Sequence, residues 1–293
     1  MFQRLLICTD LDDGMQRLVN FVPSLAACGV QQITFLHSVP LWEEGGIPRK
    51  DVEKIEAAEK FLSCALENVP DGVNVTIAVE SGKPIEAIRK TVDAMNPDII
   101  LLGAARRTLL REKLFGSTTI EIVQRIQLPL LVLRPTMLAA YTTEELDLRC
   151  RHLFHYLLVP YDGSSATEDV LKQLRDYAEK RPPDSLEALF LCWVVEDSGI
   201  RGLAKENTAN KAREILPALK DELASSLALQ VGFDLRQGNP IEETLEAAET
   251  IDVSAIAVST ERLGSFLELS GRSLTGEMLR RSFYPVLFFP YQR

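Results

Sequence analysis

The chain has 293 residues, enough for two domains of ordinary size, and its 46% hydrophobic and 25% charged residues are typical of a globular protein. This composition excludes a disordered, collagenous or coiled-coil chain. The 42 acidic residues outnumber the 32 basic ones, and the resulting net charge of −10 disfavours binding to nucleic acid.

No apolar run in the sequence approaches the roughly 20 residues that cross a bilayer, so we expect a cytosolic protein without membrane contact. The five cysteines are widely separated and form no CxxC pair. This pattern favours reduced structural thiols over a disulfide framework or a zinc site.

The first half of the chain predicts short buried strands that alternate with helices. The predicted strands are short apolar runs, several rich in β-branched residues: Leu5–Thr9, Ile33–Val39, Val73–Val79, Ile99–Gly103 and Leu130–Leu133. The predicted helices lie between them: Gly14–Ala27, Lys50–Asn68, Pro84–Met95 and Ser117–Ile126. This alternation predicts an α/β fold with a doubly wound, five-stranded parallel sheet.

A linker and a second set of strands follow. We expect a first domain over residues 1–135, a linker over 136–152 and a second domain over 153–293. Within the linker, Thr142, Thr143 and Glu145 are placed to cap a short helix. The predicted strands of the second half come in the same order as those of the first: Tyr156–Tyr161, Leu186–Val195, Leu229–Leu235, Ala255–Ser259 and Val286–Phe289.

The two halves repeat one another. A shift of 156 residues superposes ten identical residues without a gap: Gly82, Pro84, Ile85, Glu86, Ser117, Thr119, Glu121, Arg125, Pro129 and Leu131 on Gly238, Pro240, Ile241, Glu242, Ser273, Thr275, Glu277, Arg281, Pro285 and Leu287. The first strands need a shift of 152, which brings Asp10 onto Asp162. The difference predicts four extra residues in or beside the second helix of copy two, and a tandem of two similar domains.

Ligands of doubly wound sheets bind beyond the carboxyl ends of the strands, which directs attention to the residues that follow each strand. The richest such segment runs from Gly103 to Thr119. Gly116 opens a helix there, and the first amides of that helix, with the hydroxyls of Ser117, Thr118 and Thr119, are placed to surround a phosphate. The alternative is that Gly116 and Ser117 only turn the chain and cap the helix.

This segment resembles the corresponding loop of the universal stress protein family. The nucleotide-binding members of that family carry G-x2-G-x9-G-[ST] after the fourth strand, and this chain matches at Gly103, Gly116 and Ser117 but has Arg106 at the second glycine. The resemblance extends over both copies, through the aspartates that follow the first strands, the G-x-P turns at Gly82 and Gly238, and the proline-led last strands. The chain therefore resembles a tandem universal stress protein.

The resemblance implies a site for ATP or AMP, with or without Mg²⁺, in the first copy. It assigns the adenine contact to Asp10, with Ser38 beside the base, and the phosphate contacts to five residues: Gly103, Gly116, Ser117, Thr118 and Thr119. Arg106 either adds a guanidinium contact to the phosphates or fills the space that they need, and the sequence leaves both alternatives open.

The second copy keeps Asp162 but has lost most of the phosphate loop. Ser259, Arg262 and Arg272 replace the three glycines, and only Ser273 remains. We expect this copy to bind nucleotide weakly or not at all. Members of the family dimerise through the last strand, which implies that the second copy is an intramolecular dimerisation partner for the first; a further homodimer is left open.

The sequence offers little support for an enzyme. It has no G-x-S-x-G motif, its three histidines are scattered, and no general base for an ATPase is evident. The leading hypothesis is a cytosolic, non-catalytic stress-response regulator that binds adenine nucleotide in its first copy. The alternative is a ligand-free scaffold for an unidentified protein partner, with both nucleotide sites vestigial. Of the two tryptophans, we expect Trp193 in the core and Trp42 at the surface.

Overall fold

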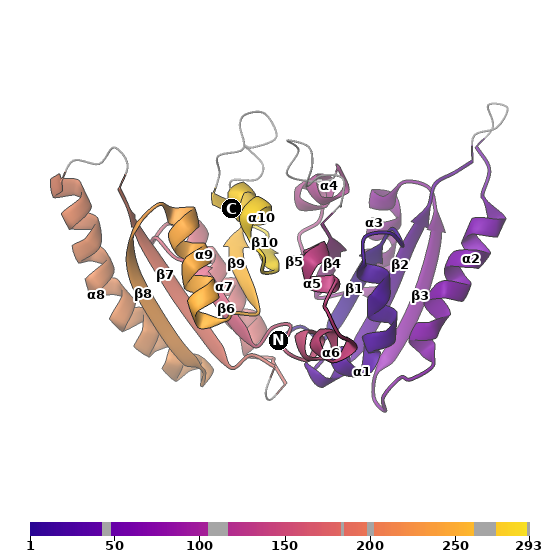
Figure 1. Cartoon of the computed structure of the whole chain (residues 1–293), viewed down its shortest axis with the longest axis horizontal. Helices are drawn as coiled ribbons and strands as arrows, with labels where there is room; N and C mark the ends of the chain where they lie inside the picture. The colour runs from indigo at the N-terminus through magenta and orange to yellow at the C-terminus, as the bar shows by residue number, and fades with distance from the viewer. Residues whose placement is uncertain (43–47, 105–116, 183–184, 198–201, 261–273, 292–293) are drawn as a thin grey trace. The chain divides into compact units, whose positions relative to one another are not determined.

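A computed structural model describes residues 1–42, 48–104, 117–182, 185–197, 202–260 and 274–291. Contacts divide the chain into two compact units, Phe2–Arg151 and His152–Arg293, and Met1 clusters with the second. Each unit is described separately below (Figure 1). Within the described residues, no helix is both long enough and apolar enough to cross a membrane.

The first unit is built on five parallel strands in the order β3-β2-β1-β4-β5. The strands are β1 Arg4–Thr9, β2 Gln32–Val39, β3 Asn74–Ser81, β4 Ile99–Gly103 and β5 Leu130–Leu133. All five predicted strands are present. The predicted doubly wound parallel sheet is confirmed, and its strand order reverses between β1 and β4.

Two predicted helices of the first unit differ from expectation. The stretch 14–27, expected as one helix, is a 3₁₀ helix, η1, over Met15–Phe21 followed by α1 over Val22–Ala27. Pro23 explains the break, because proline lacks the amide that a continuous helix would need at that position. The second helix, α2, covers Val52–Leu62 and continues as the 3₁₀ helix η2 over Ser63–Leu66.

Local signals mark the start of α2 and both ends of α3. In α2 the N-cap Asp51 accepts a hydrogen bond from the Lys54 amide at 3.1 Å. Helix α3 runs over Pro84–Met95 as predicted, and the positive φ of Asn96 (47°) ends it. Helix α4 covers Ser117–Arg125.

Residues predicted as a linker form two helices in the first unit. Helix α5 covers Pro135–Leu138 and α6 covers Thr143–Arg151. The Thr142 hydroxyl accepts from the Glu145 amide at 3.2 Å, as expected for the cap of a short helix. Helix α6 packs against α1, where the Ser24 hydroxyl donates to the carboxylate of Asp147. The segment is therefore part of the folded unit.

The second unit repeats this architecture with the strand order β10-β9-β6-β7-β8. Its strands are β6 Tyr156–Pro160, β7 Ala188–Glu196, β8 Gln230–Gly238, β9 Ala255–Ser259 and β10 Val286–Phe289. Its helices are α7 Ser165–Ala178, α8 Gly202–Leu227, α9 Pro240–Ile251 and α10 Leu274–Arg281. Helix α8 has 26 residues against 11 in α2, so the second helix region carries extra length, as the shifts predicted.

The cysteines are free thiols, four buried and only Cys64 exposed. Burial raises the pKa of the Cys28 thiol to about 12 and that of Cys192 to about 11. These two thiols therefore stay protonated at neutral pH and act as small apolar side chains, in agreement with the structural role predicted for the cysteines.

Candidate functional site

The candidate site of the first unit lies at the carboxyl ends of β1 and β4. Cys8 pairs with Leu102 in the register of these parallel strands, so Thr9 and Gly103 are the next residues along each strand. The strand order reverses between β1 and β4, and such a switch point is where doubly wound sheets bind ligands. The segments that begin at Asp10 and Ala104 therefore start side by side at this edge.

Asp10 lies at the surface of this edge. It is exposed, and its Oδ1 accepts a hydrogen bond from the Asp12 amide at 2.9 Å, which makes an Asx turn. The other carboxylate oxygen has no hydrogen bond among the described residues. This geometry suits a residue that accepts a hydrogen bond from a ligand.

Asp13 is buried in the site, and it is not among the binding residues that the sequence analysis assigned. Its Oδ1 accepts from the Thr9 hydroxyl at 3.0 Å and from the Met15 amide at 2.9 Å. Its Oδ2 lies 2.7 Å from the position that a β-carbon on Gly103 would take. Burial, and secondly the charge of Asp10, raises the pKa of Asp13 to about 6.

The absence of a side chain at Gly103 therefore makes room for a residue of the chain itself. A β-carbon there would also come within 2.9 Å of Met15 Cγ. We expected Gly103 to allow close approach of a ligand, and the structure shows the side chains of Asp13 and Met15 in the adjacent space. The repeat contained a signal that could have drawn attention to Asp13. The 152-residue shift aligns Asp13 with the neutral Ser165, so this carboxylate is specific to the first copy.

Ser38 and His37 complete the edge at the end of β2. The Ser38 hydroxyl donates to the Gly82 carbonyl at 2.9 Å and so holds the turn before α3. His37 is half-buried, and its Nδ1 lies 2.9 Å from the Thr9 carbonyl. Because a carbonyl only accepts, Nδ1 is assigned the proton, and the Nε2 of a neutral ring is an acceptor.

The phosphate-loop residues are only partly described. Arg106 and Gly116 lie outside the described residues, so the two alternatives for Arg106 stay open. Ser117 and Thr118 form the start of α4, and Thr119 is buried in its first turn. The described part of α4 therefore contains the three hydroxyl residues that the phosphate-site hypothesis assigns.

The corresponding edge of the second unit contains a tryptophan. Trp193 is 2% exposed, as predicted for a core residue, whereas Trp42 is 53% exposed. The Trp193 ring meets Tyr161 edge-on with centroids 5.6 Å apart, and its Cη2 lies 3.2 Å from the β-carbon position of Gly163. At the 156-residue shift, Trp193 corresponds to the smaller His37.

The turn after β6 is also bonded internally. Asp162 Oδ1 accepts from the Ser164 amide at 2.9 Å and from the Thr167 hydroxyl at 3.0 Å. Lys211 Nζ lies 5.9 Å from the centroid of the Trp193 ring. The indole and these contacts fill the edge of the second unit that corresponds to Asp10 and His37 in the first unit.

The fold and its switch-point edges define a tandem of two doubly wound α/β domains. The model of the universal stress protein family matches residues 1–134 and 154–290, so the chain belongs to this family. The tandem resemblance stated from the sequence is thereby confirmed.

Solved structures of similar length share the fold. A universal stress protein from Archaeoglobus fulgidus DSM 4304 is 20% identical, with a TM-score of 0.67 over 98% of this chain and 97% of that one. A protein from Pseudomonas aeruginosa UCBPP-PA14 is 13% identical, with a TM-score of 0.58 over 98% and 93%. At identities this low, the structural similarity shows a shared fold and nothing more. A comparison with curated proteins finds no match.

Proposed function

We propose that the chain is a non-catalytic stress-response regulator that binds an adenine nucleotide, ATP or AMP, in its first copy. The observation that carries the proposal is the register of β1 and β4, which sets the exposed Asp10 beside the strand that leads into the phosphate loop. Asp10 accepts a hydrogen bond from the base, and the amides at the start of α4 bind the phosphates.

The contrast between the two copies supports one nucleotide site in each chain. Trp193 fills the base end of the second copy, whereas the first copy has the half-buried His37 at that position. The second copy also lacks the glycines of the phosphate loop. In this proposal it serves as a dimerisation partner for the first copy.

Isothermal titration of the full chain with ATP and with AMP tests this assignment. We expect one nucleotide bound to each chain, and we expect Asp10→Ala and Gly116→Val to abolish binding. Asp162→Ala is the matched control, because it makes the same change at the corresponding position of the second copy and leaves binding unchanged. Absence of heat at millimolar nucleotide would refute the proposal.

A second candidate function is a ligand-free scaffold for a protein partner. The specific observation in its favour is the Asp13 carboxylate, which lies with Met15 in the space next to Gly103. An ionised carboxylate there opposes the entry of phosphate by like-charge repulsion. The scaffold function predicts that Asp13→Asn leaves the chain unable to bind nucleotide, whereas the nucleotide proposal predicts tighter binding.

A further inference from the structure

A groove on the second unit lies between α9 and the turn that joins α10 to β10. Its volume is about 690 Å³, within the range of about 300–1,000 Å³ for ligand pockets. Helix α9 contributes residues at i, i+3, i+4 and i+7, which share one helix face: Glu242, Leu245, Glu246 and Glu249. The other wall is formed by Arg281, Phe283 and Tyr284.

Phe283 is held at the surface by a fixed turn. It is 79% exposed, although its neighbour Ser282 is fully buried. The Ser282 hydroxyl accepts from the Tyr284 amide at 2.9 Å and donates to the Tyr284 carbonyl at 2.9 Å. An exposed aromatic ring on a turn of this kind needs little ordering on binding, which is the property of an interface anchor.

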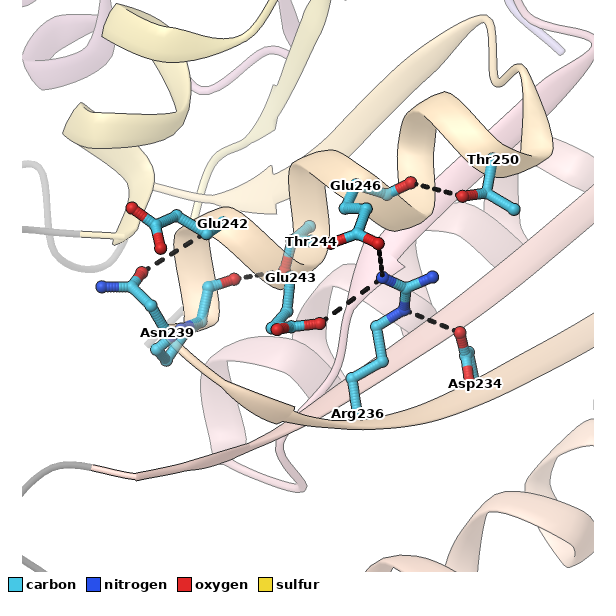
Figure 2. A network of polar contacts seen from close by, with 9 residues as sticks. Asp234, Arg236, Asn239, Glu242, Glu243, Thr244, Glu246 and Thr250 are labelled. Atoms are coloured by element: carbon cyan, nitrogen blue, oxygen red, sulfur yellow. Dashed lines mark hydrogen bonds and ion pairs between the residues drawn. The ribbon is translucent and has the colours of Figure 1, made fainter.

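The groove carries negative charge. Glu242 forms an ion pair with Arg281 at 3.1 Å. Glu246 lies 3.8 Å from Arg236 of β8, and a dashed line in Figure 2 marks this second contact. Glu249 has no ion-pair partner among the described residues. Burial raises the pKa of Tyr284, and the charges of Asp252 and Glu249 add to that effect. Three carboxylates therefore face the groove together with one guanidinium.

The first copy shows that the fold does not require this chemistry. Four groove residues have counterparts of a different type at the gapless 156-residue shift: Arg89 for Leu245, Lys90 for Glu246, Gln127 for Phe283 and Leu128 for Tyr284. The ion-paired residues Glu242 and Arg281 are retained there as Glu86 and Arg125. The carboxylate at 246 and the aromatic ring at 283 are therefore specific to the second copy, because the first copy has the same fold without them.

We propose that this groove binds an arginine-bearing segment of another protein. A guanidinium stacks on aromatic faces and pairs with carboxylates, which are the two features that Phe283, Tyr284 and Glu249 supply. The acidic rim repels phosphopeptides and other anions. A second copy of this chain also has a net charge of −10, so long-range repulsion opposes its approach.

Titration with a basic peptide tests the proposal. The probe is acetyl-Leu-Arg-Leu-Arg-amide, added to the nucleotide-free full chain in a calorimeter. We expect Glu249→Gln and Phe283→Ala each to weaken binding about tenfold, in the range of interface hot spots. The matched controls are Glu56→Gln, which removes an equal charge from the first unit, and Tyr141→Ala, which removes a ring that is 98% exposed. Both should retain the wild-type affinity.

Four outcomes would overturn the proposal. Equal weakening of peptide binding by Glu249→Gln and Glu56→Gln would show that the peptide is held only by long-range attraction to an acidic protein. Equal binding of the citrulline analogue would remove the role of the guanidinium charge. Absence of binding at millimolar peptide would show that the groove does not bind an arginine-bearing segment. Conversion of a dimer to a monomer by Phe283→Ala, measured by light scattering, would show that a second copy covers the groove.

Discussion

The carboxylate of Asp13 occupies the space beside Gly103, because a β-carbon at position 103 would lie 2.7 Å from Asp13 Oδ2. This contact joins the segment after β1 to the end of β4, the two strands between which the sheet order reverses. The same carboxylate is held by the hydroxyl of Thr9 and the amide of Met15. Asp13 therefore links the stability of the first unit to the electrostatics of its candidate site.

Gly103→Ala should destabilise the first unit. The new methyl group would contact Asp13 and Met15 at less than 3 Å, and overpacking of this kind costs about 1–3 kcal/mol. Urea unfolding measures the loss. The same substitution in an Asp13→Ala background should cost less stability, because the carboxylate nearest to the new methyl group is absent. Equal losses in both backgrounds would contradict the contact.

The stability of the chain should fall as pH rises through the titration of Asp13. Its folded pKa of about 6 exceeds the ordinary value of 3.8, so the native state holds this proton more tightly than the unfolded state. The stabilisation is complete below about pH 4 and is lost by about pH 7, and a shift of about two units corresponds to about 3 kcal/mol.

Asp13→Asn isolates this contribution. Urea unfolding from pH 4 to pH 7 should show wild type losing stability relative to Asp13→Asn over that interval. Asp12→Asn is the matched control, because Asp12 is exposed on the same turn and should follow the wild-type curve. Parallel curves for wild type and Asp13→Asn would show that Asp13 titrates normally.

The affinity for ATP should also depend on Asp13. At pH 7.5 the ionised carboxylate opposes phosphate at this edge, so Asp13→Asn should bind ATP about tenfold more tightly, equivalent to about 1.4 kcal/mol. Below pH 5 the two proteins should bind equally. Titration of both at each pH cancels the protonation of ATP itself. Weaker binding by Asp13→Asn would instead assign Asp13 a favourable contact with the ligand.

Local signals were sufficient to predict the regular elements. Helix α3 begins and ends as predicted, because Pro84 suits a first turn and the left-handed Asn96 stops the helix. The stretch 14–27 was predicted wrongly as one helix, since the effect of Pro23 on the preceding turn was not considered. Apolar runs likewise located every strand, with ends that differ by up to three residues, the largest difference being at the end of β8.

The candidate site was less predictable, because its decisive contacts join distant residues. Asp10 follows β1 and Ser38 lies near the end of β2, so both could be found by position. The contact between Asp13 and Gly103 depends on the turn at Gly14 and on the pairing of β1 with β4, which no local pattern encodes. The burial of Trp193 was expected from its apolar surroundings, but its contact with Gly163 depends on the pairing of β6 with β7.

Trp193 should be a major stabilising residue of the second unit. The side chain is 2% exposed and packs against Tyr161 and Gly163, so Trp193→Ala should cost about 3–5 kcal/mol through the cavity that it leaves. Trp42→Ala is the matched control in the first unit, and its half-exposed ring should cost far less. Urea unfolding followed by circular dichroism gives both values without relying on tryptophan emission. If the two substitutions cost the same, the indole of Trp193 does not fill the base end of the second copy, and that copy regains its place as a candidate nucleotide site.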